Sequence, residues 1–197
     1  MRYSGPIVPT YFEQSLAQLE IFEGSVAWMY LDTRSNVTVG VGLMLPDRAT
    51  ASALAFVDAA GDPSAPADIA ADFDRVSALA PAMRPQFYRA PTSPQLPQTV
   101  IDANLSEVLT RFEATVRAGL AGYDALPDSA KMALLDMAYN LGPNGLLKGY
   151  PKMLQAVETG NWAEAAAQCA RGGIGAARNA WTSQQFLAAG LPPAQDS

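Results

Sequence analysis

Residues that favour extended structure are confined to one part of this chain, and this confinement limits the fold more than any other feature. Val26 to Leu31 and Val37 to Leu45 are rich in β-branched and aromatic side chains. The five residues between them, Asp32 to Asn36, are polar turn formers. We therefore expect a single β-hairpin in an otherwise helical α+β protein.

In most of the remaining sequence, apolar residues recur at the spacing of a helix. Thr10 followed by Glu13 has the spacing of a capping box and predicts a helix that runs to about Glu23. Asp128 to Leu141 is apolar on nearly all sides, so it should be the central buried helix. The other expected helices are Thr50 to Ala60, Thr99 to Ala118, Pro151 to Glu158, Trp162 to Arg171, and Ala176 to Ala189, with prolines 192 and 193 beyond the last.

Prolines interrupt the chain repeatedly between residues 62 and 97, although Ile69 to Leu79 has the pattern of a short helix. We interpret this segment as an irregular connection. The expected organisation is one domain over residues 1–197, with a helix-and-hairpin lobe at 10–60 and a helical lobe at 98–190. Its 197 residues are enough for one sizeable core.

The composition excludes several kinds of function. The chain has no histidine, which removes His-dependent nucleophile systems and imidazole zinc sites, and we expect no metal site. The lone Cys169 cannot form an internal disulfide and is expected to be buried. With a net charge of −6 and no basic run, the chain is a poor candidate for binding nucleic acid. In an enzyme of this composition, carboxylates must move the protons.

Glu23 lies on the apolar face of its own predicted helix, because it follows Leu19 by four residues and Leu16 by seven. An inward carboxylate is partly removed from water, and this raises its pKa. Such a group can donate a proton near neutral pH, as a general acid must. The alternative is a helix-end residue that pairs with a cation or turns to solvent.

Asp32 begins the hairpin turn and Thr38 begins the returning strand, so both can converge with Glu23 on one cleft. Hydrolysis of a glycosidic bond needs a protonated carboxyl beside the leaving oxygen and a second carboxylate that directs a water molecule. Glu23 and Asp32 suit these roles, and the Thr38 hydroxyl suits the orientation of the water. The alternatives are an Asx-turn residue for Asp32 and an ordinary strand threonine for Thr38.

These residues resemble a known signature. Eight residues separate Glu23 from Asp32 and five separate Asp32 from Thr38, which is similar to the E-x8-D-x5-T pattern of phage-type lysozymes, glycoside hydrolase family 24. The resemblance extends to Tyr30, to Gly40 and Gly42 of the hairpin, and to three later segments: 133–142 with its Asn140, 153–155 and 160–166. It covers most of the chain outside residues 63–97 and the ends.

The resemblance implies a two-lobed lysozyme-like fold, mainly helical with a small β-hairpin lobe beside a helical lobe. It also implies cofactor-free cleavage of the β-1,4 bond between N-acetylmuramic acid and N-acetylglucosamine in peptidoglycan, with inversion. Glu23 would be the acid, and Asp32 and Thr38 would hold the attacking water. Arg178 is the candidate for the arginine that accompanies the acid in this family, and a plain solvated charge is its alternative. Asn140 would line the cleft or serve the end of its helix.

Two features depart from the family. Leu43 stands where the family usually has a histidine, and the protein is acidic, whereas lysozymes that act on anionic walls tend to be basic. We expect the enzyme to tolerate the first change, because that histidine is supporting. Because of the second, binding should depend on local contacts in the cleft more than on long-range steering.

Three functions remain open from the sequence: a muramidase for lysis or antibacterial attack, an inactive lysozyme-like module that binds cell walls, and an enzyme acting on chitin or chitosan. The expected partner is the glycan strand of peptidoglycan. Residues Met1 to Pro9 have no apolar signal segment and no long apolar span follows, so we expect synthesis in the cytoplasm, no membrane insertion, and action on the wall in the periplasm or outside the cell. We expect a monomer; the sequence leaves open whether an immunity or inhibitor protein plugs the cleft.

Overall fold

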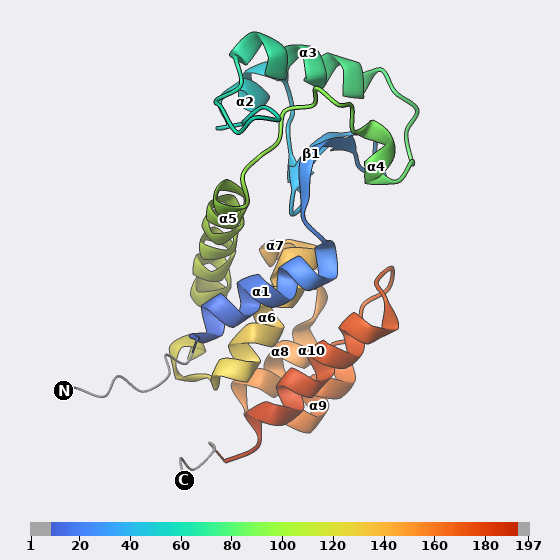
Figure 1. Cartoon of the computed structure of the whole chain (residues 1–197). Helices are drawn as coiled ribbons and strands as arrows, with labels where there is room; N and C mark the ends of the chain where they lie inside the picture. Colours follow the sequence, from blue (N-terminus) through green and yellow to red (C-terminus); the bar gives the residue numbers. More distant parts are fainter. Residues whose placement is uncertain (1–8, 193–197) are drawn as a thin grey trace, which may run out of the picture. The chain divides into compact units, whose positions relative to one another are not determined.

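The computed structural model describes residues 9–192 of the chain, which divide into two compact units (Figure 1). Unit 2 comprises residues 19–107, and unit 1 comprises the described parts of residues 1–18 and 108–197. Two helices, α1 (Tyr11–Glu23) and α5 (Gln98–Gly119), continue from one unit into the other. The expected lack of a signal segment concerns residues 1–8, which lie outside the described residues, and so does proline 193.

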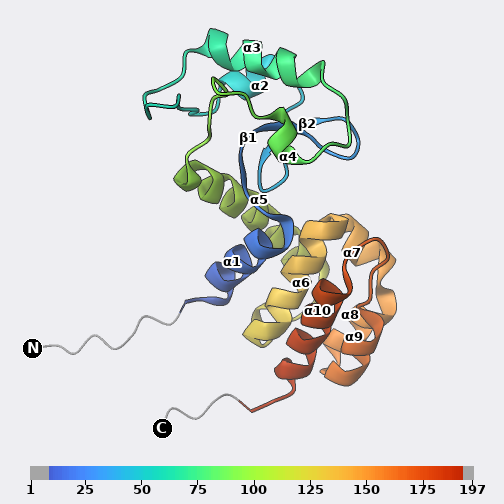
Figure 2. The same ribbon diagram turned by 45° about the vertical axis from the view of Figure 1, so that its right-hand side comes forward.

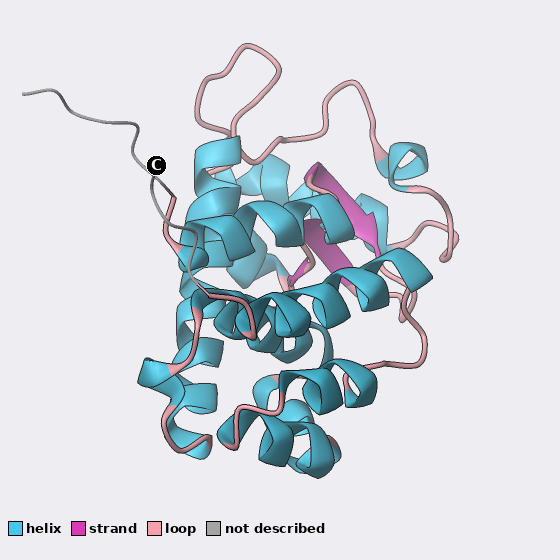
Figure 3. Cartoon of the chain, turned by 90° about the horizontal axis from the view of Figure 1, so that it is seen from below, coloured by secondary structure: helices cyan, strands magenta, loops and turns pink. Residues whose placement is uncertain are grey.

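Unit 2 is built on a three-stranded antiparallel sheet, the magenta element of Figure 3. Its strands are β1 (Val26–Leu31), β2 (Val37–Gly40) and β3 (Leu43–Met44), in that order across the sheet. The expected hairpin and the α+β class are therefore confirmed. The expected second strand is divided, because Gly40 and Gly42 adopt positive φ angles of 64° and 74° and turn the chain back on itself.

The helix expected at residues 50–60 is much shorter than its pattern predicts. Helix α2 spans Arg48–Ser52 and begins at Asp47, whose side chain accepts a hydrogen bond from the Thr50 amide. The chain then extends, and Val57 exchanges two 2.8 Å backbone hydrogen bonds with Gln95. This pairing between distant residues overrides the local helical preference.

The proline-rich segment 62–97 is more ordered than an irregular connection, because it contains two helices, the first of which confirms the short helix expected at Ile69 to Leu79. Both α3 (Pro66–Ser77) and α4 (Pro85–Tyr88) begin with a proline, a position where the missing N–H costs nothing. Figure 2 shows α3, α4 and the strands as neighbours within unit 2, in agreement with the contacts of both helices with β1. Trp28 of β1 donates a 2.9 Å hydrogen bond to the Pro85 carbonyl.

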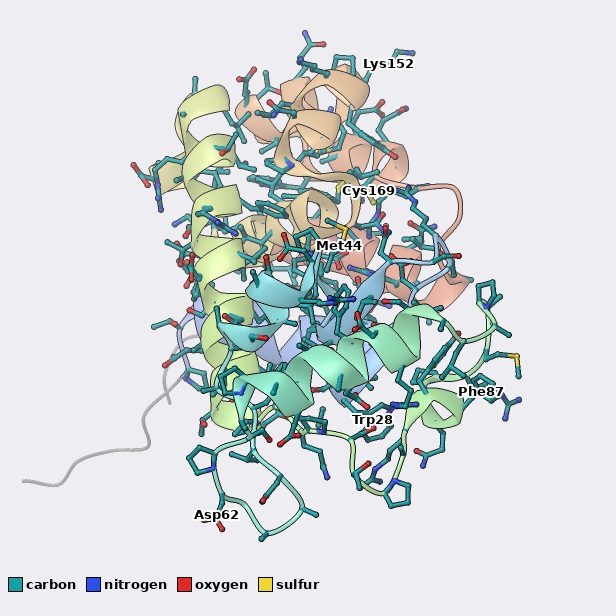
Figure 4. All side chains as sticks on the ribbon, turned by 90° about the horizontal axis from the view of Figure 1, so that it is seen from above. Trp28, Met44, Asp62, Phe87, Lys152 and Cys169 are labelled. Atoms are coloured by element: carbon teal, nitrogen blue, oxygen red, sulfur yellow. The ribbon has the colours of Figure 1, made fainter. Side chains whose placement is uncertain are left out.

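Arg75 of α3 holds the rest of this segment in place. Its guanidinium donates to the Tyr88 carbonyl at 2.7 Å, to the Ser93 hydroxyl at 3.0 Å and to the buried Asp72 carboxylate at 2.8 Å. Figure 4 shows Asp62 at the tip of the loop that precedes α3 and Phe87 on α4. One guanidinium therefore connects residues that the sequence separates by several prolines.

Unit 1 is a helical assembly around α6 (Asp128–Leu141), which matches the expected central helix residue for residue. Every side chain from Ala130 to Ala138 is buried. Helix α6 packs against the two helices α7 and α10 (Figure 2). The remaining elements of this unit are η1 (Tyr123–Ala125), α7 (Pro143–Gly149), α8 (Pro151–Glu158), α9 (Trp162–Gln168) and α10 (Ala176–Ala189).

Most of these helices follow the expected bounds. The pattern misses α7, and α9 ends three residues before the expected Arg171. Asn161 caps the start of α9, since its side chain accepts from the Glu164 amide at 3.2 Å. Cys169 is 1% exposed, as expected for a small apolar side chain (Figure 4).

Within unit 1, the start of α1 is held by hydrogen bonds to the buried carboxylate of Glu113 on α5. Its Oε1 atom accepts hydrogen bonds from Tyr11 at 2.6 Å, from Tyr123 at 3.1 Å and from Arg117 at 3.0 Å. Burial and the hydrogen bond to Glu113 raise the pKa of Tyr11 to about 12. Burial and the Glu113 charge also raise the pKa of Tyr123.

Candidate functional site

The hairpin turn is organised by the Asp32 carboxylate. Its Oδ1 atom accepts hydrogen bonds from the backbone amides of Arg34 and Asn36, each at 2.8 Å, and its Oδ2 atom accepts from the Asn36 side-chain amide at 3.0 Å. The Asx-turn role that the sequence left open is therefore present. It does not exclude a chemical role, because each carboxylate oxygen has more than one lone pair.

The same contacts keep Asp32 ionised. Partial burial by itself would raise the pKa of this carboxyl, but the hydrogen bonds from Asn36 and Arg34 and the positive charge of Arg34 outweigh it. The pKa of Asp32 therefore lies below its usual range. An ionised carboxylate of this kind can accept a hydrogen bond, and then a proton, from a water molecule.

Thr38 is placed by the register of the sheet. It pairs directly with Tyr30 across β1 and β2, and Leu31 pairs with Val37. Because side chains alternate along a strand and paired residues share a face, Tyr30, Asp32 and Thr38 are directed to the same face of the hairpin. Thr38 is buried, and its hydroxyl donates a 3.1 Å hydrogen bond to the Asn36 carbonyl.

The pKa of Tyr30 is affected by both candidate catalytic carboxylates. Burial raises the pKa of its phenol, and the negative charges of Asp32 and Glu23 raise it further. Both charges act on the same hydroxyl, so both carboxylates lie near Tyr30. The structure thus brings together Glu23, Tyr30, Asp32 and Thr38, all within unit 2.

The expected burial of Glu23 is wrong. Glu23 is the last residue of α1 and is exposed, although Leu19 one turn earlier is buried. Helical periodicity predicts which face of a helix a residue lies on. At the last position of a helix, however, the segment that covers the preceding turn need not extend far enough to cover the side chain. Gly24 follows with φ of 74° and ends the helix. The shielding from solvent that the sequence predicts for this carboxyl is therefore absent.

The two hairpin glycines have different surroundings. Gly40 is buried, and a Cβ atom at this position would lie 3.2 Å from Cγ2 of Ile101 on α5. Ile101 therefore occupies the space beside this glycine. Gly42 is exposed and occupies the turn between β2 and β3. Leu43 pairs with Val39 in the sheet.

Arg178 is buried, so its interpretation as a solvated charge is wrong. Its Nε atom lies 2.7 Å from Oδ1 of Asp136, a carboxylate on α6 that is 2% exposed. The other oxygen of Asp136 accepts from Arg171 at 2.6 Å and from Thr182 at 2.8 Å. This network is part of unit 1.

Sequence reasoning did not single out Asp136, Arg171 or Thr182. The signal available was Asp136 itself, a charge between Leu135 and Met137 in a mostly apolar helix, which must find a partner to be buried. Asn140 is exposed in the last turn of α6, and the turn that ends this helix is made by Gly142, with φ of 72°. Like Arg178, Asn140 belongs to unit 1.

The described residues hold no group of three or more acidic or thiol side chains arranged to bind a metal ion. Within the same residues, no helix is both long and apolar enough to cross a membrane. No protein-family model matches the chain, and no curated protein matches it.

Proposed function

We propose that this protein is a lysozyme-like peptidoglycan hydrolase, an N-acetylmuramidase that cleaves the β-1,4 bond between N-acetylmuramic acid and N-acetylglucosamine. The observation that carries the proposal is that unit 2 holds two carboxylates around the hairpin: Asp32, which shares a face with Tyr30 and Thr38, and Glu23, which ends the helix that leads into β1. Their environments differ, since Asp32 is held by the turn and Glu23 is exposed. Hydrolysis of a glycosidic bond uses two carboxyl groups with different roles, one that donates a proton and one that acts on a water molecule.

In this mechanism Glu23 donates a proton to the bridging oxygen as the glycosidic bond breaks. Its exposure is compatible with this role if the sugar chain covers it, because a bound glycan excludes water from the carboxyl and allows direct proton transfer. Asp32 is ionised before the reaction and accepts a proton from the attacking water, which the Thr38 hydroxyl helps to orient. The protein would act on the wall outside the cytoplasm, in bacterial lysis or as an antibacterial effector.

The decisive experiment compares Glu23→Gln with Glu158→Gln in the clearing of a peptidoglycan suspension. Glu158 is the matched control, because it too is an exposed glutamate at the last position of a helix. We expect Glu23→Gln to lower the rate by about 10²–10⁴-fold, the usual contribution of general acid catalysis. Glu158→Gln should keep the wild-type rate. Equal rates for the two variants would contradict the role of Glu23.

A second experiment tests the stereochemistry. Attack by water on the face opposite the leaving oxygen inverts the anomeric carbon, so the sugar first released should be the α anomer. Proton NMR of the reaction at early times distinguishes the two anomers. Initial release of the β anomer would contradict a water-directing role for Asp32, because it implies a covalent intermediate.

One observation favours a second candidate, an inactive module that binds the cell wall. Both oxygens of Asp32 already accept hydrogen bonds within the turn, and Glu23 lacks the expected shielding. A purely structural hairpin would have these same properties. Sedimentation with insoluble peptidoglycan that releases no muropeptides would support this candidate, and released muropeptides would exclude it.

A further inference from the structure

Asn36 lies between the two groups that the proposed mechanism assigns to the water. Its side-chain amide donates to Oδ2 of Asp32 at 3.0 Å and its backbone amide donates to Oδ1 at 2.8 Å. Its carbonyl accepts from the Thr38 hydroxyl at 3.1 Å. One residue therefore contacts both Asp32 and Thr38 through three separate polar groups.

These contacts fix the direction of each hydrogen bond. A carboxylate only accepts, so the amide nitrogen of Asn36, and not its oxygen, must face Asp32. A carbonyl also only accepts, so the single hydrogen of the Thr38 hydroxyl is committed to the Asn36 carbonyl. The Thr38 oxygen is then left with its lone pairs and acts toward any further ligand as an acceptor.

Two acceptors on one face select the orientation of a water molecule between them. Such a water donates one hydrogen to Asp32 and the other to Thr38, and its own lone pairs point away from both. This is the orientation in which a water attacks a carbon atom. If the Thr38 hydroxyl were free to rotate, it could instead donate to the water and occupy one of the lone pairs needed for attack.

We propose that Asn36 is a positioning residue that holds the Asp32 carboxylate and the Thr38 hydroxyl in place as two acceptors for the hydrolytic water. This inference rests on the hydrolase function proposed above. In the step it serves, the water oxygen bonds to the anomeric carbon as the bond from that carbon to the bridging oxygen breaks. The bridging oxygen takes the proton of Glu23, and Asp32 takes a proton from the water. Proton exchange with solvent then restores both carboxyl groups.

The test replaces Asn36 by Asp and by Ala. Asn36→Asp keeps the shape of the side chain but places an acceptor and a negative charge against Asp32. Asn36→Ala only removes the side-chain donor, and the backbone contacts with Asp32 and Thr38 remain. We expect kcat on peptidoglycan to fall by about 10-fold in Asn36→Ala and about 100-fold in Asn36→Asp, since a hydrogen bond to a charged group has this range of effect. KM should change little. Asn144→Asp, which changes the same residue type on an exposed part of unit 1, is the control.

A second readout does not depend on activity. NMR titration of the Asp32 carboxyl should show its pKa raised in Asn36→Ala and raised further in Asn36→Asp. Among the described residues, Arg34 on the turn and Tyr30 on β1 interact electrostatically with Asp32, and both are kept in the two variants, as is Glu23 at the end of α1. The acidic limb of the pH profile of kcat should move upward with the Asp32 pKa.

The outcomes separate this inference from the function on which it rests. A wild-type protein that does not hydrolyse peptidoglycan overturns both. Hydrolysis that depends on Glu23, with kcat unchanged in Asn36→Asp, overturns the role of Asn36 alone. A larger loss in Asn36→Ala than in Asn36→Asp also overturns it, because the shape of the side chain and not its donor would then matter.

Discussion

Asp136→Asn is expected to destabilise unit 1 strongly, because Asp136 is the negative charge in direct contact with two buried guanidinium groups. The side chain of Asp136 is 3% exposed, that of Arg171 is 0% exposed and that of Arg178 is 9% exposed. Removing the charge leaves two cations in contact with a neutral amide. One half of that amide is a donor and repels the N–H groups that face it.

The expected loss in the free energy of unfolding is about 3 to 5 kcal/mol, the usual cost of breaking a buried ion pair by removing one partner. Asp124→Asn is the matched control within unit 1. Asp124 also forms an ion pair, with Arg117 at 2.8 Å, but its side chain is 80% exposed. A pair in this environment contributes about 0 to 1 kcal/mol, because water solvates both charges when the pair is broken.

The assay is urea unfolding followed by tryptophan fluorescence in a Trp28→Phe background. Of the three tryptophans of the chain, Trp28 lies in unit 2, so its removal leaves Trp162 and Trp181 to report on unit 1. With a slope of about 1 to 3 kcal/mol per molar urea, the midpoint of Asp136→Asn should fall by at least about 1 M. Equal midpoints for Asp136→Asn and Asp124→Asn would refute the reasoning, because burial would then make no difference.

Three further predictions concern the hairpin and the start of α1. Gly40→Ala should lower the free energy of unfolding, measured with urea, by about 1 to 3 kcal/mol. Gly61→Ala is the control and should lower it less. Both glycines have positive φ angles, but only the new Cβ atom at position 40 would meet a neighbouring side chain. The low pKa of Asp32 adds stability that is fully present above the unfolded-state pKa of about 3.9 and is lost as the pH falls through the lower folded-state pKa. Asp32→Asn should therefore flatten the acid limb of a plot of thermal midpoint against pH, and an unchanged limb would contradict this. The raised pKa of Tyr11 adds stability that is present below pH 10 and is lost as the pH rises through about 12. Tyr11→Phe removes the hydrogen bond to Glu113 and should lower the free energy of unfolding at neutral pH. Because the titrating phenol is also gone, the thermal midpoint of the variant should fall less steeply above pH 10 than that of the wild type. A variant as stable as wild type at neutral pH would show that this hydrogen bond contributes nothing.

The sequence alone predicted the features that depend on neighbouring residues. The capping box of α1 forms as expected, with the Thr10 amide donating to Glu13 at 2.8 Å. The hairpin turn forms at Asp32 to Asn36, and the central helix has the predicted bounds of α6. In each case the interacting groups lie within a few residues of one another, so the local pattern contains the whole interaction.

Only the tertiary structure decided which charges are buried. Periodicity predicts an inward Glu23 and leaves Arg178 free to be solvated, yet Glu23 is exposed and Arg178 is paired with Asp136, forty-two residues earlier in the chain. Likewise, Arg75 orders a segment whose prolines predict irregularity, through contacts 13 and 18 residues away. Burial depends on which distant segment covers a side chain, and no short stretch of sequence contains that information.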